Sequence, residues 1–197
     1  MSSPSRPLAV CLSVLVATAG LCPPGAQAAR NAQDAAPVCP GILQHTFPRL
    51  QDEKPQALCQ YAGKVVLVVN TASFCAFTPQ YRGLEALDSK YRARGLVVLG
   101  FPSNDFAQES GSNKDIADFC ENTFGVKFPM FSKSSVRGAD ANPLFKELAR
   151  VSGTTPKWNF YKYLIGRDGT VVKAYSSMTS PEDRAFVSDL ERQLDRE

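Results

Sequence analysis

The chain has 197 residues, with 22 lysines and arginines against 19 aspartates and glutamates, and a formal net charge of +3. A charge this small and this evenly spread gives no basis for binding nucleic acid or an anionic membrane surface. His45 is the only histidine, which argues against a histidine-rich metal site and against a histidine proton relay. From composition we therefore expect no metal and no cofactor, and a length that suits one domain with a single core.

The first residues have the pattern of an export signal. Arg6 supplies a charge, residues 8–21 are apolar, and Ala26-Gln27-Ala28 is a small-residue cleavage site. The apolar segment is too short to stay as a spanning helix, so we expect no stable membrane anchor and an exported protein, periplasmic or secreted. The expected organisation is a signal peptide at 1–28, a small, proline-marked linker at 29–41 and a folded domain at 42–197.

Six cysteines are present, of which Cys11 and Cys22 lie in or near the apolar part of the signal. The other four are Cys39, Cys59, Cys75 and Cys120. Because an exported chain tolerates disulfides, pairing must be considered for each of these. Cys39 and Cys59 bracket a predicted hairpin, and a disulfide between them closes a loop of about 20 residues. Two buried free thiols are the alternative, and we favour the disulfide.

The expected elements follow from hydrophobic periodicity and turn residues. In chain order they are short strands at 45–50 and 57–61, a buried strand at 64–70, a helix at 79–92, a buried strand at 95–101, a helix at 113–124, an extended segment at 128–131, a helix from 142, a hairpin at 160–165 and 170–175, and a last helix opening at Ser180-Pro181. A βαβ unit followed by an antiparallel hairpin and a closing helix predicts an α/β fold, with a mixed sheet flanked by helices. A thioredoxin-like fold has this element order.

Cys75 lies between a buried strand and the start of a helix. Thr78 and Pro79 predict an N-cap and a first helical residue. A thiol at this end of a helix faces the positive end of the macrodipole, which favours the thiolate. Cys75-Ala-Phe-Thr78 carries threonine where a dithiol oxidoreductase has its second cysteine. The sequence therefore predicts a nucleophilic cysteine that does not work as half of a CxxC pair.

The segment Asn70-Thr-Ala-Ser-Phe-Cys75-Ala-Phe-Thr-Pro-Gln-Tyr81 resembles the glutathione peroxidase family. Three further segments resemble the family in the expected order: Phe101-Pro-Ser-Asn-Asp-Phe106, Phe128-Pro-Met-Phe131 and Trp158-Asn-Phe160. The resemblance spans roughly residues 42 to 195. It implies a thioredoxin-like fold and a peroxidase that reduces hydrogen peroxide and organic hydroperoxides through a cysteine sulfenic acid, in response to oxidative stress.

The resemblance also implies roles for single residues. Cys75 is the expected nucleophile, and the indole N–H of Trp158 and the amide of Asn159 are expected to be donors held against its sulfur. Without this motif a lone tryptophan is more typical of a core aromatic. The family's glutamine after the asparagine corresponds here to Asp105, which the resemblance therefore makes a candidate catalytic residue. As a carboxylate, however, Asp105 accepts hydrogen bonds and repels a thiolate.

We therefore expect Asp105 to be turned away or protonated, or Asn104 to supply the missing amide. The segment that follows, residues 107–111, is one residue shorter than the common family form.

The expected helix at 113–124 contains Cys120. Compact family members that use thioredoxin carry a resolving cysteine there, which makes Cys120 a candidate for that role; a buried apolar thiol is the other interpretation. The short stretch from Phe131 to Trp158 lacks the extra loop of tetrameric members, which implies a monomer or dimer that accepts bulky hydroperoxides. The reductant is expected to be a thioredoxin-like protein or glutathione.

Two other functions fit the same fold. The first is a thiol-disulfide or copper-chaperone-like protein, which would need a second cysteine near Cys75 and a late histidine, and the chain has neither. The second is a non-catalytic relative, for which Asp105 is the best argument.

Overall fold

The computed structural model describes residues 38–196, so the expected signal peptide and most of the expected linker lie outside the described residues. The centre of the fold is a four-stranded sheet with the order β4-β3-β5-β6. Its strands are β3 (Val65–Thr71), β4 (Leu96–Pro102), β5 (Lys162–Ile165) and β6 (Val171–Tyr175). The pair β3 and β4 is parallel, and the pairs β3–β5 and β5–β6 are antiparallel.

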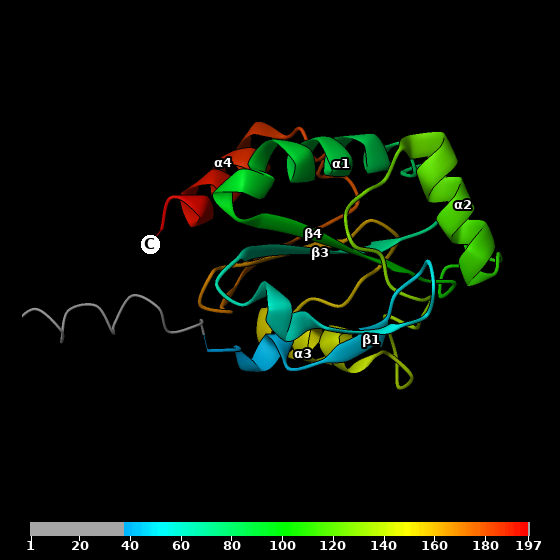
Figure 1. The fold of residues 1–197 in the computed structure, drawn as a ribbon, viewed down its shortest axis with the longest axis horizontal. Coiled ribbons are helices and arrows are strands. Elements are labelled where there is room, and N and C mark those ends of the chain that lie inside the picture. The colour runs from blue at the N-terminus through cyan, green and yellow to red at the C-terminus, as the bar shows by residue number, and fades with distance from the viewer. Residues whose placement is uncertain (1–37, 197) are drawn as a thin grey trace, which may run out of the picture. The chain divides into compact units, whose positions relative to one another are not determined.

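Helices cover both faces of this sheet (Figure 1). On one face lie α1 (Gln80–Tyr91) and α4 (Arg184–Leu194), and on the other lie α3 (Pro143–Ser152) and the separate hairpin of β1 (Thr46–Pro48) and β2 (Pro55–Ala57). The remaining helix, α2 (Asn113–Phe124), lies at one end of the sheet. The predicted mixed α/β architecture is confirmed.

The alternation of side chains along β3 builds two hydrophobic cores. Val65, Leu67 and Val69 belong to the core that includes residues of α1 and α4, whereas Val66 and Val68 belong to the core that includes residues of α3. All seven residues of β3 are buried, as expected for a strand covered on both faces. This central position fixes the end of β3, from which the chain runs directly to Cys75.

Two expected elements differ from the structure. Residues Leu58–Tyr61 form a 3-10 helix, η2, in place of nearly all of the strand expected at 57–61, and β2 ends at Ala57. Leu58 and Tyr61 are both buried, and a spacing of three places them on one side of such a helix. The last helix begins at Arg184, where the Asp183 carboxylate accepts from the Phe186 N–H at 3.0 Å. Ser180 therefore does not cap it, and residues 180–183 form a turn instead.

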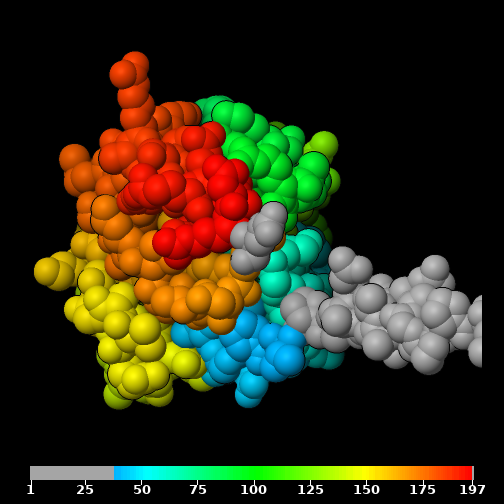
Figure 2. Space-filling model, turned by 90° about the vertical axis from the view of Figure 1, so that its left-hand side faces the viewer, coloured from blue at the N-terminus to red at the C-terminus, as the bar shows by residue number. Residues whose placement is uncertain are grey.

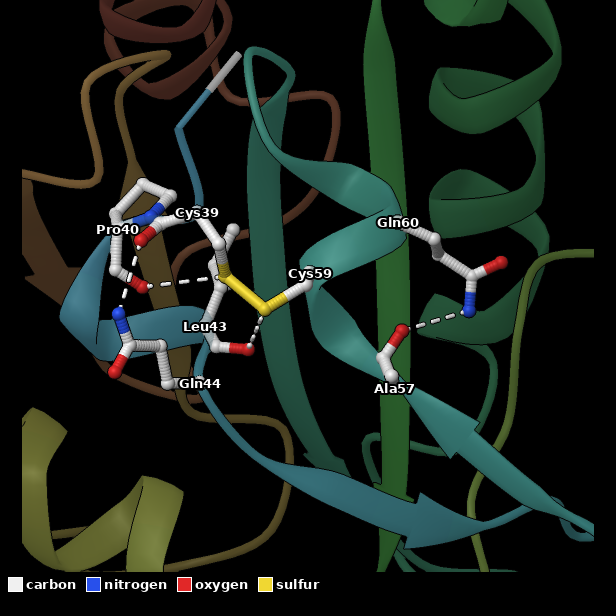
Figure 3. Close-up of a disulfide and its surroundings, with 7 residues drawn as sticks. All are labelled: Cys39, Pro40, Leu43, Gln44, Ala57, Cys59 and Gln60. Carbon is white, nitrogen blue, oxygen red and sulfur yellow. Dashed lines mark hydrogen bonds between the residues drawn. A yellow bond between two sulfur atoms is a disulfide. The ribbon is translucent and has the colours of Figure 1, made fainter. Parts of the chain in front are cut away.

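A disulfide attaches the start of the described chain to the domain. Cys39 and Cys59 are joined with an S–S distance of 2.05 Å and a Cα–Cα distance of 5.2 Å (Figure 3). Pro40 packs against Gly169, where an added Cβ would lie 2.2 Å from the Pro40 Cβ, and Figure 2 shows this blue segment beside the orange β5–β6 region. The last residues of the expected linker are therefore held against the folded domain.

Candidate active site

Cys75 lies in the turn between β3 and α1. Its thiol is free, and the residue is 8% exposed. The sulfur accepts a hydrogen bond from the backbone N–H of Phe77 at 3.4 Å. The turn therefore holds a nearly buried sulfur beside a main-chain donor.

Thr78 shapes this turn and does not cap the helix. Its hydroxyl accepts from the Cys75 N–H at 3.0 Å and donates to the Ala72 carbonyl at 2.9 Å. The helix α1 begins at Gln80, after Pro79, and has no side-chain cap. The expected Thr78 N-cap is therefore wrong, because the Thr78 hydroxyl is hydrogen-bonded to two main-chain groups of the Cys75 turn instead of to the start of the helix. At the position where a dithiol oxidoreductase has its second cysteine, this chain has Thr78, and both hydrogen bonds of its hydroxyl stabilise the Cys75 turn.

Gln108 supplies an amide beside the Cys75 turn. The N–H of Phe74 donates to the Gln108 carbonyl at 3.1 Å, and the Asn159 side-chain amide donates to Gln108 Oε1 at 2.9 Å. Sequence reasoning missed Gln108 because it looked for the glutamine directly after Asn104. The available signal was Gln108 itself, a second amide three residues after Asp105 in the same segment.

Asp105 is not part of this arrangement. Its carboxylate accepts from the Ser135 hydroxyl at 3.0 Å and from the N–H groups of Val136 and Arg137 at 2.6 and 3.1 Å. Of the three expectations for Asp105, the structure has the first, a carboxylate turned away toward the 135–137 loop. Asn104 is exposed and its side-chain oxygen accepts from the Glu109 N–H at 2.9 Å, and within residues 38–196 its amide donates no hydrogen bond to the Cys75 sulfur.

Trp158 and Asn159 are held near the end of β3 by Asn70. The Asn70 side chain donates to the Trp158 carbonyl at 3.0 Å and accepts from the Tyr161 N–H at 3.0 Å. Trp158 remains 40% exposed, whereas Asn159 is fully buried. Within residues 38–196 neither side chain donates a hydrogen bond to the sulfur, and the Asn159 amide is directed to Gln108. The expected hydrogen bonds to the sulfur are thus not formed among the described residues.

Cys120 is buried in α2, and its exposed fraction is 2%. Burial raises the pKa of the Cys120 thiol to about 11. The residue before it, Phe119, lies beside Phe74, the residue before Cys75, with ring centroids 6.3 Å apart. The structure therefore packs the helix that contains Cys120 against the turn that contains Cys75.

The described residues offer little to a metal ion. Between residues 38 and 196, no group of three or more histidine, cysteine, aspartate or glutamate side chains is placed to hold one. In the same range, no helix is both long and apolar enough to cross a membrane.

Comparison with known proteins assigns the chain to a family. Residues 43–149 match the sequence model described as Glutathione peroxidase. The chain belongs to the glutathione peroxidase family. Among its relatives, the hydroperoxy fatty acid reductase gpx1 of Synechocystis sp. is 47% identical over 73% of this chain and 90% of its own length. The glutathione peroxidase-like peroxiredoxin gpx1 of Schizosaccharomyces pombe is 47% identical over 68% of this chain and 89% of its own.

Solved structures agree with this assignment to the glutathione peroxidase family. The crystal structure of T. cruzi GPX1 is 32% identical and has a TM-score of 0.62, covering 78% of this chain and 95% of that one. A thioredoxin-family thiol:disulfide interchange protein from Chlorobium tepidum is only 16% identical, with a TM-score of 0.59 over 82% of this chain and 99% of its own, and so shows the fold alone. The predicted thioredoxin-like fold is confirmed.

Proposed function

We propose that this member of the glutathione peroxidase family is a thiol-dependent peroxidase with Cys75 as its nucleophile. The thiolate attacks one oxygen of the peroxide, the O–O bond breaks, and the products are Cys75 sulfenic acid and an alkoxide or hydroxide that takes up a proton. A thiol then attacks the sulfenic sulfur and water leaves; a second thiol releases Cys75 as the free thiol. The observation that carries the proposal is the free thiol of Cys75, a residue that is 8% exposed, in a turn whose Phe74 N–H is hydrogen-bonded to the Gln108 carbonyl.

Gln108, Asn159 and Trp158 are proposed to stabilise the charges that develop in this reaction. An amide and an indole can donate hydrogen bonds, whereas a carboxylate cannot. Donors fixed in place before the reaction stabilise an oxyanion without reorganisation. The Gln108–Asn159 hydrogen bond leaves the Gln108 amide hydrogens available for the sulfur or the leaving oxygen once peroxide is bound.

Organic hydroperoxides with a long apolar part are the substrates we propose. Phe74 is 67% exposed and Trp158 is 40% exposed. Met178 is 79% exposed and directly follows Ser177, whose hydroxyl donates a hydrogen bond to the Asn159 carbonyl. Large exposed apolar side chains gathered near one site indicate an apolar ligand or partner. The relative from Synechocystis sp. named a hydroperoxy fatty acid reductase supports the same substrate class.

Cys120 is proposed as the resolving thiol. Together with Cys75 it is one of the two free cysteines among the described residues, and its helix packs against the Cys75 turn. A disulfide requires the two α-carbons to approach within about 7 Å, so part of α2 must unwind to release the buried thiol. A thioredoxin-like protein then reduces the disulfide; glutathione acting directly on the sulfenic acid is the competing route.

We further propose that the protein is exported and works as a monomer or dimer, outside the reducing cytosol. The export pattern of residues 1–28 and the Cys39–Cys59 disulfide support this placement. Fractionation of the producing cells, with N-terminal sequencing of the mature chain, tests both the compartment and the cleavage site.

Peroxide consumption by the purified mature chain is the experiment that tests the proposed function. Hydrogen peroxide and cumene hydroperoxide are each supplied with glutathione or with a thioredoxin system, and disappearance of peroxide is followed. We expect turnover with at least one pair and a faster reaction with cumene hydroperoxide. Absence of turnover and of any sulfenic acid on Cys75 would leave the non-catalytic relative as the better description.

A further inference from the structure

Lys162 is a lysine buried without an acidic partner. It is the first residue of β5 and its exposed fraction is 0%. Its Nζ donates to Gln80 Oε1 at 2.6 Å and to the Phe160 carbonyl at 2.9 Å. Within residues 38–196 no carboxylate forms an ion pair with it, and burial lowers its pKa to about 7. Burying an amine in this way opposes folding, so stability does not explain why a lysine occupies this position.

The two acceptors of Lys162 belong to the two segments that must meet at the active site. Gln80 is the first residue of α1, the helix that follows Cys75. Phe160 comes directly after Asn159, in the loop that enters β5. Lys162 therefore joins the helix behind Cys75 to the loop that carries Trp158 and Asn159.

A chain of hydrogen bonds extends this link to Asn159. Gln80 Nε2 donates to the Ser177 carbonyl at 2.7 Å. The Ser177 hydroxyl in turn donates to the Asn159 carbonyl at 2.5 Å. Lys162 fixes the orientation of the Gln80 amide. The amide oxygen must face Lys162 to accept its hydrogen bond, which leaves the amide nitrogen to donate to the Ser177 carbonyl.

The backbone of Phe160 has a strained conformation that needs hydrogen bonds to hold it. Its φ is +63°, in the left-handed region that a bulky residue rarely adopts. Its N–H donates to the Asn70 carbonyl at 2.6 Å, and its carbonyl accepts from Lys162 Nζ at 2.9 Å. Strain of this kind persists only where surrounding contacts hold it. Asn70 and Lys162 thus pair the main-chain N–H and the carbonyl on either side of the Phe160 α-carbon.

We propose that Lys162 is a positioning residue of the peroxidase, whose two hydrogen bonds hold the Trp158–Asn159 loop in register with the Cys75 helix. This inference rests on the proposed function of Cys75. Without the amine, the buried Phe160 carbonyl and the half-buried Gln80 oxygen both lose their donor, which is costly enough to move the loop. Displacing the loop separates the Asn159 amide from Gln108 and the Trp158 ring from Phe106.

The substitution Lys162→Met tests this, since methionine fills similar space without a donor. The second-order rate constant for oxidation of Cys75 by hydrogen peroxide is measured by mass spectrometry after quenching. We expect a decrease of about tenfold or more, since misplacement of catalytic groups by about 1 Å can cost a factor of about 100. Trp158 is the only tryptophan, so its fluorescence emission reports the loop directly, and we expect it to shift.

Lys173→Met is the matched control. Lys173 lies on the neighbouring strand β6, is exposed, and forms an ion pair with Asp189. Its replacement makes the same lysine-to-methionine change on the surface and should change neither the rate nor the emission.

Gln80→Met is the second variant. It keeps Lys162 but breaks the chain to Ser177, so it decides the question if Lys162→Met fails to fold. Folded Lys162→Met or Gln80→Met protein with the parent's rate and emission would overturn the proposal. If the parent itself shows no oxidation of Cys75 by peroxide, the proposed function fails, while the shift in Trp158 emission still tests the positioning role.

Discussion

Phe74 and Phe119 lie with their ring centroids 6.3 Å apart, and each is the residue immediately before a free cysteine. This contact links the Cys75 turn to α2 through the neighbours of the two thiols. It brings two elements together while burial keeps Cys120 itself in the core. We therefore expect a disulfide between the two thiols to form only with a rearrangement that brings the Cys120 thiol out of the core.

Cys75→Ser is expected to abolish peroxide turnover and leave the fold intact. A serine hydroxyl is far less ionised than a thiol near neutral pH and is a much weaker nucleophile toward peroxide. Turnover is measured with cumene hydroperoxide, and circular dichroism checks the fold. Activity near that of the parent would exclude Cys75 as the nucleophile.

One equivalent of hydrogen peroxide is expected to produce a Cys75–Cys120 disulfide. Peptide mapping without reduction detects the linkage, and Cys120→Ser should instead accumulate sulfenic acid on Cys75, which dimedone traps. Cys120→Ser should also lose turnover with thioredoxin while retaining any turnover with glutathione. A parent protein that keeps a sulfenic acid on Cys75 and a free Cys120 contradicts the resolving role.

Gln108→Ala is expected to slow oxidation of Cys75 by about 10-fold to 100-fold, because one preorganised donor is lost. Asp105→Ala is the comparison within the same loop. It should leave this rate near that of the parent and lower the free energy of unfolding by about 1–3 kcal/mol, because the N–H groups of Val136 and Arg137 lose their acceptor. The reverse pattern of rates would return the catalytic role to Asp105.

Replacing Cys39 and Cys59 together by alanine is expected to lower the free energy of unfolding by about 3 kcal/mol, the chain-entropy value for a loop of this size. Their sequence separation is 20 residues. Urea unfolding followed by circular dichroism measures the loss, and the same loss should appear when the parent is unfolded with a reductant. Peroxide turnover of the folded variant should be unchanged, since the disulfide is not part of the Cys75 site.

The stability of the parent relative to Lys162→Met should rise with pH between about 7 and 10. In the unfolded chain this lysine has its ordinary pKa of about 10.4, whereas burial lowers it to about 7 in the folded protein. Across that window the unfolded state binds more protons, so the free energy of unfolding increases by at most about 1.4 kcal/mol per pH unit. Below the folded pKa both states are charged and the relative stability reaches its lower limit. Urea titrations of the two proteins at matched pH measure the difference, and a flat difference would show that Lys162 keeps an ordinary pKa.

Sequence by itself determined the local features of this protein. The apolar runs that became β3 and β4, the helix at 113–124, the position of Cys75 after a buried strand, and the family all depend on residues close together in the chain. Periodicity and short motifs report such features because they reflect the surroundings of neighbouring residues.

Only the tertiary structure decided which distant side chains meet. Gln108 reaches Asn159 across 51 positions, and Lys162 reaches Gln80 across 82, through the pairing of β3 with β5. In the sequence, Asp105 is a candidate catalytic residue and Thr78 a candidate helix cap. In the structure, the Asp105 carboxylate accepts from the Val136 N–H and the Thr78 hydroxyl donates to the Ala72 carbonyl. A buried polar group must be paired wherever the fold places it, and that place depends on the packing of the whole chain.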